Sequence, residues 1–166
     1  MTDTATRLAT RLVDGRDRTV QFFSKLSPEQ RSVQVYIEGN CWTVGDILAH
    51  MLATEISIYR LLVHILNGGP GAPEDFDINA YNERKVWELR EIDPPELLQR
   101  FKDERETTIQ LVLGLSMDDL AKQGRHPFLG PASLSEIIKL MCMHNQIHIR
   151  DIRRMLPTSE GKFAEG

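Results

Sequence analysis

Apolar residues recur at alternating steps of three and four along four long stretches of the chain, which is the spacing of one helix face. The last stretch begins with a capping-box pattern, Ser133 followed by Glu136. In the second stretch Thr43 suits an N-cap, and Asp46 lies in the first turn, where a carboxylate is favoured. The pattern therefore predicts four long amphipathic helices, covering residues 6–26, 43–66, 94–115 and 133–156.

The segments between these helices are predicted to be short helices and loops. Residues 33–37 alternate like a strand, but a strand without a partner leaves its backbone unsatisfied, so we expect an extended linker or a short turn. A short helix is expected in residues 76–90 and another piece near residues 116–120. Residues 125–131 are expected to form a compact loop.

The order of these elements predicts an all-α fold. A crossover of roughly 25 to 28 residues between the second and third helices can return the chain to the opposite end of a bundle. We therefore expect a four-helix bundle with up-down-down-up topology over residues 1–157, followed by a polar tail at 158–166. On the third helix, Glu104 and Arg105 are assigned to the solvated face.

Three histidines fall where this topology can bring them together. His148 occupies a seam position that normally holds an aliphatic side chain, and His144 lies one turn earlier on the same face. His50 is about 10 Å beyond the start of the second helix, and His148 is about 12 Å before the end of the fourth. Antiparallel helices would place them at one level, whereas parallel helices would separate them by roughly 12 Å.

Neutral imidazoles that converge in this way suit a borderline metal ion such as Zn²⁺. Three histidines with an open position are typical of a catalytic zinc site, because water or substrate can reach the metal. For the pair His144 and His148 alone, a surface or hydrogen-bonded pair is the alternative interpretation, because H-x-x-x-H is a common pattern. His64 lies about 21 Å from His50 along the same helix, so we assign it to a rim or packing position.

The composition and net charge of the chain argue against several classes of protein. The 166 residues are 41% hydrophobic and 27% charged, as in an ordinary globular domain. A net charge of −4 argues against nucleic-acid partners, which need a basic face. No apolar run is long enough to cross a membrane, and Cys41 and Cys142 do not form a disulfide framework. We therefore expect a cytoplasmic protein, with both cysteines in structural roles.

Two motifs contain the three histidines: the run from Trp42 to His50 at the start of the second helix, and the H-x-x-x-H run from His144 to His148. Both resemble motifs of the DinB-like (DinB/YfiT) metal-binding bundles. Residues 76–82 and 126–130 are similar to further segments of the superfamily. Many members have Gly-Gln after the last ligand, whereas this chain has Arg150-Asp151.

The resemblance implies a divalent metal, Zn²⁺ or Ni²⁺, held by His50, His144 and His148. It also implies a homodimer, a small-molecule substrate and kinship with enzymes that use low-molecular-weight thiols such as bacillithiol, mycothiol or glutathione. Two functions then compete: a metal-dependent thiol S-transferase or hydrolase, and a non-catalytic, stress-related bundle that binds metal or a small ligand. Asp151 is either an acceptor behind a ligand histidine or an exposed partner of a neighbouring arginine.

Overall fold

The computed structural model describes residues 3–157, and its four long helices are those predicted from the sequence. They are α1 (Asp3–Ser24), α3 (Val44–Leu66), α5 (Pro94–Leu113) and α7 (Leu134–Met155). The shorter elements are α2 (Pro28–Arg31), α4 (Ile78–Leu89), α6 (Met117–Ala121), β1 (Gln123–His126) and β2 (Gly130–Ser133). The predicted polar tail at 158–166 lies outside the described residues.

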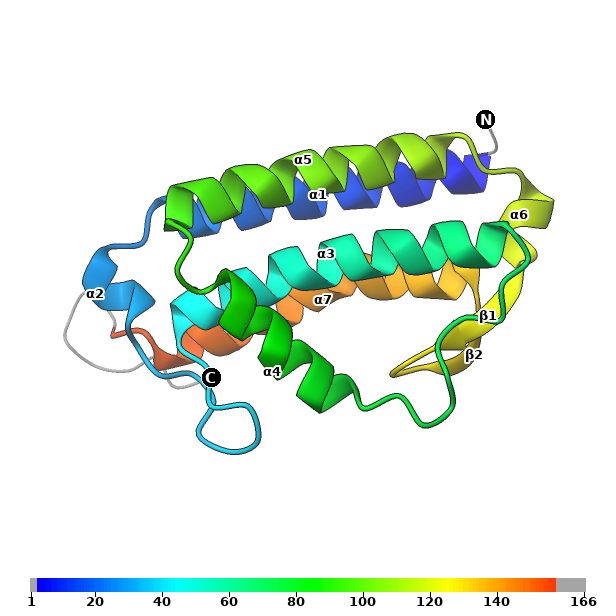
Figure 1. Cartoon of the computed structure of the whole chain (residues 1–166). Coiled ribbons are helices and arrows are strands. Elements are labelled where there is room, and N and C mark those ends of the chain that lie inside the picture. The colour runs from blue at the N-terminus through cyan, green and yellow to red at the C-terminus, as the bar shows by residue number, and fades with distance from the viewer. Residues whose placement is uncertain (1–2, 158–166) are drawn as a thin grey trace.

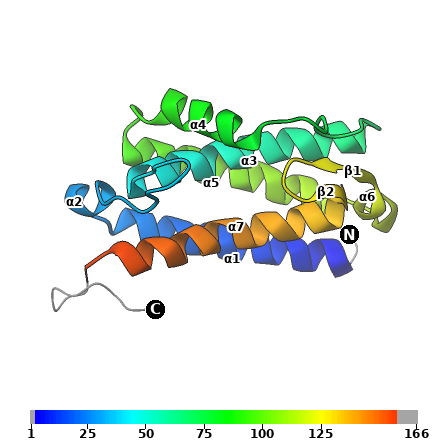
Figure 2. The same cartoon turned by 90° about the horizontal axis from the view of Figure 1, so that it is seen from below.

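The long helices form the predicted up-down-down-up bundle. In Figure 1, α1 and α7 run from right to left, and α3 and α5 run from left to right. Helix α1 packs against α5 and α7, and α3 packs against the same two helices. Figures 1 and 2 show β1, β2 and α6 at one end of the bundle and α2 at the other. Helices α3 and α7, which carry the three histidines, are therefore antiparallel neighbours, as the sequence predicted.

Capping groups fix where the two histidine-bearing helices begin. Thr43 Oγ1 accepts from the backbone N–H of Asp46 at 3.2 Å, and Asp46 Oδ2 accepts from the backbone N–H of Thr43 at 3.1 Å. Ser133 and Glu136 form the same reciprocal pair at the start of α7. Each cap satisfies backbone donors that the first helical turn leaves unpaired. The two helices therefore start at defined residues, which sets the level of the side chains along them.

The prediction of a compact loop at residues 125–131 was wrong. Strands β1 and β2 pair in antiparallel register, with Gln123 opposite Ser133 and His126 opposite Gly130. Each strand has only four residues, and neither shows the apolar alternation by which strands are recognised. Gly130 closes the turn with a φ of 72°, a conformation that favours glycine.

The long crossover between α3 and α5 is attached to this hairpin. The backbone N–H of Ala72 donates to Arg125 O at 2.8 Å, and that of Arg125 donates to Pro70 O at 2.8 Å. Gly71 lies between them with a φ of 89°, and a Cβ at this position would come within 2.3 Å of Arg125 N. The crossover approaches β1 so closely that only glycine fits there. It then continues into α4, which packs against α3.

The bundle core consists of two hydrophobic clusters with polar side chains between them. One cluster is centred on residues such as Leu12, Leu62 and Ile138, and the other on residues such as Trp42, Phe101 and Ile152. On each long helix, at least one buried polar residue falls between the positions that belong to the two clusters. We call this set the polar layer; it comprises Thr19, Glu55, Arg105, Thr108 and Asn145.

The assignment of Arg105 to a solvated face was wrong. Its side chain is 2% exposed and forms two hydrogen bonds of 2.8 Å with the carboxylate of Glu55, whose side chain is 3% exposed. Thr108 Oγ1 donates to the same carboxylate at 3.0 Å. Arginine is rarely buried unless it is paired, and its partner here lies on another helix, fifty positions away in the sequence.

Candidate metal centre

The structure brings together the three histidines that the sequence singled out. His50 Nε2 lies 3.0 Å from His144 Nε2, and His148 Nε2 lies 3.2 Å from the same atom. One ring nitrogen from each residue falls within 4.8 Å of the others. Among residues 3–157, this is the group of histidine, cysteine and carboxylate side chains that has metal-site geometry. His64 is not part of it, as its distance along α3 predicted.

Each imidazole has a partner at its other ring nitrogen. His144 Nδ1 lies 3.2 Å from Asn145 Oδ1, and His50 Nδ1 lies 3.5 Å from Thr54 Oγ1. Asn145 Oδ1 can only accept, so His144 Nδ1 carries the proton in this contact. The proton on Nδ1 leaves Nε2 of His144 as a lone pair directed at the common point.

A tyrosine and a carboxylate fix which ring nitrogen of His148 carries the proton. Tyr36 Oη donates to Asp151 Oδ2 at 2.9 Å and lies 2.7 Å from His148 Nδ1. Because the single hydroxyl proton of Tyr36 points at the carboxylate, His148 Nδ1 must donate to Tyr36 Oη. His148 Nε2 is then unprotonated and faces His144 Nε2. Two lone pairs 3.2 Å apart repel each other unless a cation or a proton lies between them.

Tyr36 was not identified from the sequence. It lies in the segment predicted to be an extended linker or a turn, and the structure shows an extended segment held locally by residues 42–44. Val35 donates its backbone N–H to Trp42 O at 2.9 Å, which places the next residue beside α7. Asp151 accepts a hydrogen bond from Tyr36, which in turn contacts His148, and its carboxylate also lies 3.6 Å from Arg150.

Burial keeps the three imidazoles neutral. Burial, followed by the repulsion of His148, lowers the pKa of His144 from 6.5 to about 3. Burial also lowers the pKa of His148 to about 4, against the opposing effect of Asp151. The pKa of His50 is lowered well below its ordinary value by burial and by the other two histidines. Trp42 covers His50, with the ring centroids 4.6 Å apart.

These lowered pKa values predict that the metal-free protein loses stability in mild acid. Between about pH 6.5 and pH 4 the unfolded chain binds protons at His144 and His148 that the folded chain does not. The contribution of these histidines to the free energy of unfolding should therefore be complete above pH 6.5. It should fall as the pH drops towards 4, by at most about 1.4 kcal/mol per pH unit for each histidine. Urea unfolding with a chelator present, at a series of pH values, measures this slope. The slope should be smaller in His144→Gln and unchanged in His64→Gln; equal slopes in all three proteins would contradict the assignment.

The donor set fits a divalent cation. Zn–N bonds of about 2.0–2.1 Å in tetrahedral geometry separate the nitrogens by about 3.3 Å. Two of the three separations, 3.0 and 3.2 Å, are close to this value, and the third pair of nitrogens lies within 4.8 Å. The partners of His144 and His148 leave a lone pair on Nε2 of each, and the opposite ring nitrogen of all three imidazoles has a partner, as in metal sites generally. The three residues thus have the chemistry and the spacing to hold such an ion.

One side of the histidine cluster opens into a pocket of about 510 Å³. All three histidines line it, together with side chains of α3, α4, α7 and the β1–β2 turn. Most of the wall is apolar, including Leu61, Phe76 and Met141. The volume is in the range of small-molecule sites. A ligand in this pocket would contact the open side of the cluster.

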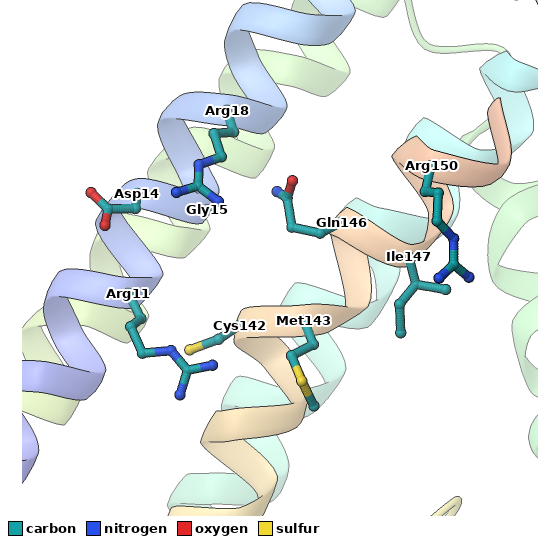
Figure 3. Close-up of a pocket in the computed structure, with 9 residues that line it drawn as sticks. All are labelled: Arg11, Asp14, Gly15, Arg18, Cys142, Met143, Gln146, Ile147 and Arg150. Carbon is teal, nitrogen blue, oxygen red and sulfur yellow. The ribbon is translucent and has the colours of Figure 1, made fainter. Parts of the chain in front are cut away.

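A second pocket, of about 490 Å³, lies between α1 and α7 and has a different character (Figure 3). Three arginines line it, and in Figure 3 the side chain of Cys142 points towards α1. Burial raises the pKa of the Cys142 thiol, so this cysteine is a poor nucleophile. Cys41 is exposed and its thiol contacts Gly39 O at 3.6 Å. Cys142 belongs to a core cluster, in agreement with the structural role predicted for it.

Comparison with known proteins agrees with the predicted fold. The family model described as DinB superfamily matches residues 11–152. YfiT from Bacillus subtilis, described as a probable metal-dependent hydrolase with an unusual four-helix bundle topology, superposes with a TM-score of 0.74. The two are 17% identical, and the match covers 92% of this chain and 86% of YfiT. No curated protein matches the sequence.

A mycothiol-dependent maleylpyruvate isomerase is also similar, with a TM-score of 0.70 and 16% identity. The match covers 92% of this chain but only 63% of the isomerase. Identities this low show a shared fold. None of the helices among residues 3–157 is long and apolar enough to cross a membrane.

Proposed function

Because the chain belongs to the DinB superfamily, we propose that it is a divalent-metal protein that transfers a low-molecular-weight thiol or hydrolyses a small substrate. In this proposal His50, His144 and His148 hold the ion, with Zn²⁺ and Ni²⁺ as the candidates. The observation that carries the proposal is the convergence of three imidazole Nε2 atoms at the wall of an apolar pocket. Metal dependence and thiol dependence in the described neighbours support the same chemistry.

A divalent cation bound by the three imidazoles would supply Lewis acidity, lowering the pKa of a thiol or water in contact with it. Residues of the chain hold and cover the imidazole rings. Tyr36 and Asp151 hold the ring of His148, and Trp42 covers the ring of His50. The wall on the open side of the cluster is mostly apolar, so a bound ligand that fills the pocket would displace water there and strengthen charge interactions. No carboxylate of the polar layer acts as a base, since Glu55 is fully paired with Arg105 and Thr108.

The thiol arm of the proposal has a direct test. Protein without a histidine tag is stripped of metal and reloaded with Zn²⁺ or Ni²⁺. It is then mixed with bacillithiol, mycothiol or glutathione and a chromogenic aryl halide. In the reaction the thiolate sulfur forms a bond to the aryl carbon, and halide leaves. An aryl ester in place of the halide tests hydrolysis. We expect turnover with metal and a fall of more than about 100-fold after removal of the metal. Turnover that survives in His148→Ala would contradict the proposal.

A non-catalytic metal- or ligand-binding bundle is the alternative function, because a fold can carry different activities at the same place. The largely apolar pocket beside the histidines is the observation that favours it. Tight binding of metal by the wild-type protein, with no turnover for any thiol or ester, would select this alternative. A homodimer and a cytoplasmic location remain predictions; light scattering on the purified chain tests the first.

Tyr36→Phe should weaken metal binding without removing a ligand. The variant keeps the ring but loses the hydroxyl that joins His148 Nδ1 to Asp151. Loss of an outer partner of a metal-binding histidine typically lowers metal affinity 10- to 100-fold. Competition with a chromogenic chelator measures the Kd for Zn²⁺. Tyr59→Phe, a tyrosine on α3 outside the pocket lining, is the matched control. Equal affinities for both variants and the wild type would rule out this role for Tyr36.

A further inference from the structure

A fourth histidine of the same pocket has a fixed protonation pattern. The backbone N–H groups of Phe128 and Leu129 both donate to His126 Nδ1, at 3.0 and 3.2 Å. These bonds form within the turn that joins β1 to β2. A nitrogen that accepts hydrogen bonds carries no proton, so the single proton of neutral His126 must lie on Nε2.

The Nε2–H of His126 is an unused donor. Among residues 3–157 no acceptor pairs with it. It is also not among the fully buried side-chain atoms that lack a partner, so it retains some accessible surface. The whole residue is only 4% exposed and lines the pocket beside the histidine cluster. The pocket is therefore where this N–H can reach a partner. Burial lowers the pKa of His126, which keeps the ring a neutral donor.

The surroundings of this donor define what it can recognise. Apolar side chains form most of the pocket wall, among them Ile58, Ile137 and Leu140. Of the other polar groups, Ser57 Oγ donates to Ala53 O and lies 2.7 Å from Tyr81 Oη, so those two hydroxyls are engaged with each other. In such a pocket a few placed polar groups orient a largely apolar ligand.

We propose that His126 is a substrate-recognition residue, whose Nε2–H donates to a carbonyl or carboxylate oxygen of a small, largely apolar molecule in this pocket. The inference rests on the proposed function for its biological meaning, since it names the substrate class of the same site. An electrophile of this class would place its acceptor oxygen on His126 and its apolar body against α3 and α7. The reacting carbon would then face the side of the pocket formed by His50, His144 and His148.

The test uses two probes of equal shape on the Zn²⁺-loaded protein. Acetonaphthone carries a carbonyl oxygen, and isopropenylnaphthalene has a CH₂ group in its place. The quantity of interest is the ratio of their Kd values, in the wild type and in His126→Phe. If His126 donates to the oxygen, the preference for the ketone should fall about three- to tenfold in the variant, the effect expected of one hydrogen bond. Tyr59→Phe, which changes a residue of α3 outside the pocket lining, should leave the ratio unchanged.

A second measurement keeps the inference testable if His126→Phe fails to fold, since the variant also removes the acceptor of two backbone N–H groups. Nitrogen NMR of the wild type reports which ring nitrogen of His126 carries the proton. We expect a protonated Nε2 whose resonance shifts with the ketone and not with the alkene. A proton on Nδ1, or no shift with the ketone, would overturn the proposal.

The outcomes separate this inference from the proposed function. Contact of the ketone oxygen with the ion would give a preference that persists in His126→Phe and vanishes on metal removal, which would contradict a role for His126. A preference that depends on His126, together with no turnover for any thiol or ester, would support the recognition role and reject the enzymatic function.

Discussion

His148→Ala is expected to lower the affinity for Zn²⁺ by more than about 100-fold, beyond the loss caused by removing an outer partner of a ligand. The variant removes one of three converging Nε2 atoms and leaves Tyr36 without its imidazole partner. In the wild type, free Zn²⁺ at a thousand times its Kd should stabilise the fold by about 4 kcal/mol. For a chain of this size, that raises the Tm by about 8 to 16 °C. In the variant, the same concentration should contribute less than about 1.4 kcal/mol.

The measurement compares the Tm of each protein with Zn²⁺ and with a chelator, so that any effect of the substitution on the metal-free fold cancels. His64→Ala is the matched control, because His64 lies on α3 and lines the same pocket without joining the cluster. It should keep the full Zn²⁺-dependent gain. Chelation that leaves the wild-type Tm unchanged would show that the cluster does not bind Zn²⁺ tightly.

Arg105→Met should be the most destabilising of the substitutions considered. Without the guanidinium, the carboxylate of Glu55 stays buried beside Thr108 with no opposing charge. Breaking a buried ion pair in this way costs about 3–5 kcal/mol. The corresponding loss in Tm is about 6 to 20 °C for a chain of this size. Urea unfolding of the metal-free protein gives the change in free energy directly.

Two further variants show whether the buried charge is the cause. Arg100→Met removes an exposed arginine of the same helix that pairs with Glu96, and it should cost less than about 1 kcal/mol. The double variant Glu55→Leu/Arg105→Met should regain most of the stability, because no unpaired charge remains. A cost for Arg105→Met no larger than that for Arg100→Met would contradict this account.

The meeting of His50 with His144 and His148 could be predicted because it depends on local rules. Helix starts are marked by Thr43 and Ser133, and the rise per residue then gives the level of each side chain. The long crossover determines which helices run antiparallel. These three pieces of information are all present in the sequence, so the core of the candidate site followed from it.

The surroundings of the cluster depend on contacts that periodicity does not record. Tyr36 reaches His148 because its segment pairs with residues 42–44, and the two side chains are 112 positions apart. Arg105 has a polar neighbourhood in the sequence, and its partner Glu55 becomes visible only when α3 and α5 pack together. His126 acquires its fixed proton from a hairpin whose strands are too short to predict.

The polar layer affects how precisely the four helices are aligned along one another. Sliding one helix by a single turn, about 5.4 Å, would bring the ion pair of Glu55 and Arg105 against aliphatic side chains. Unpaired buried charge makes such slippage costly, whereas purely aliphatic seams tolerate several alignments. The polar layer thus disfavours sliding of any of the four helices along its neighbours. Side chains on α5, which do not belong to the histidine cluster, thereby help to keep the imidazoles at their observed spacing.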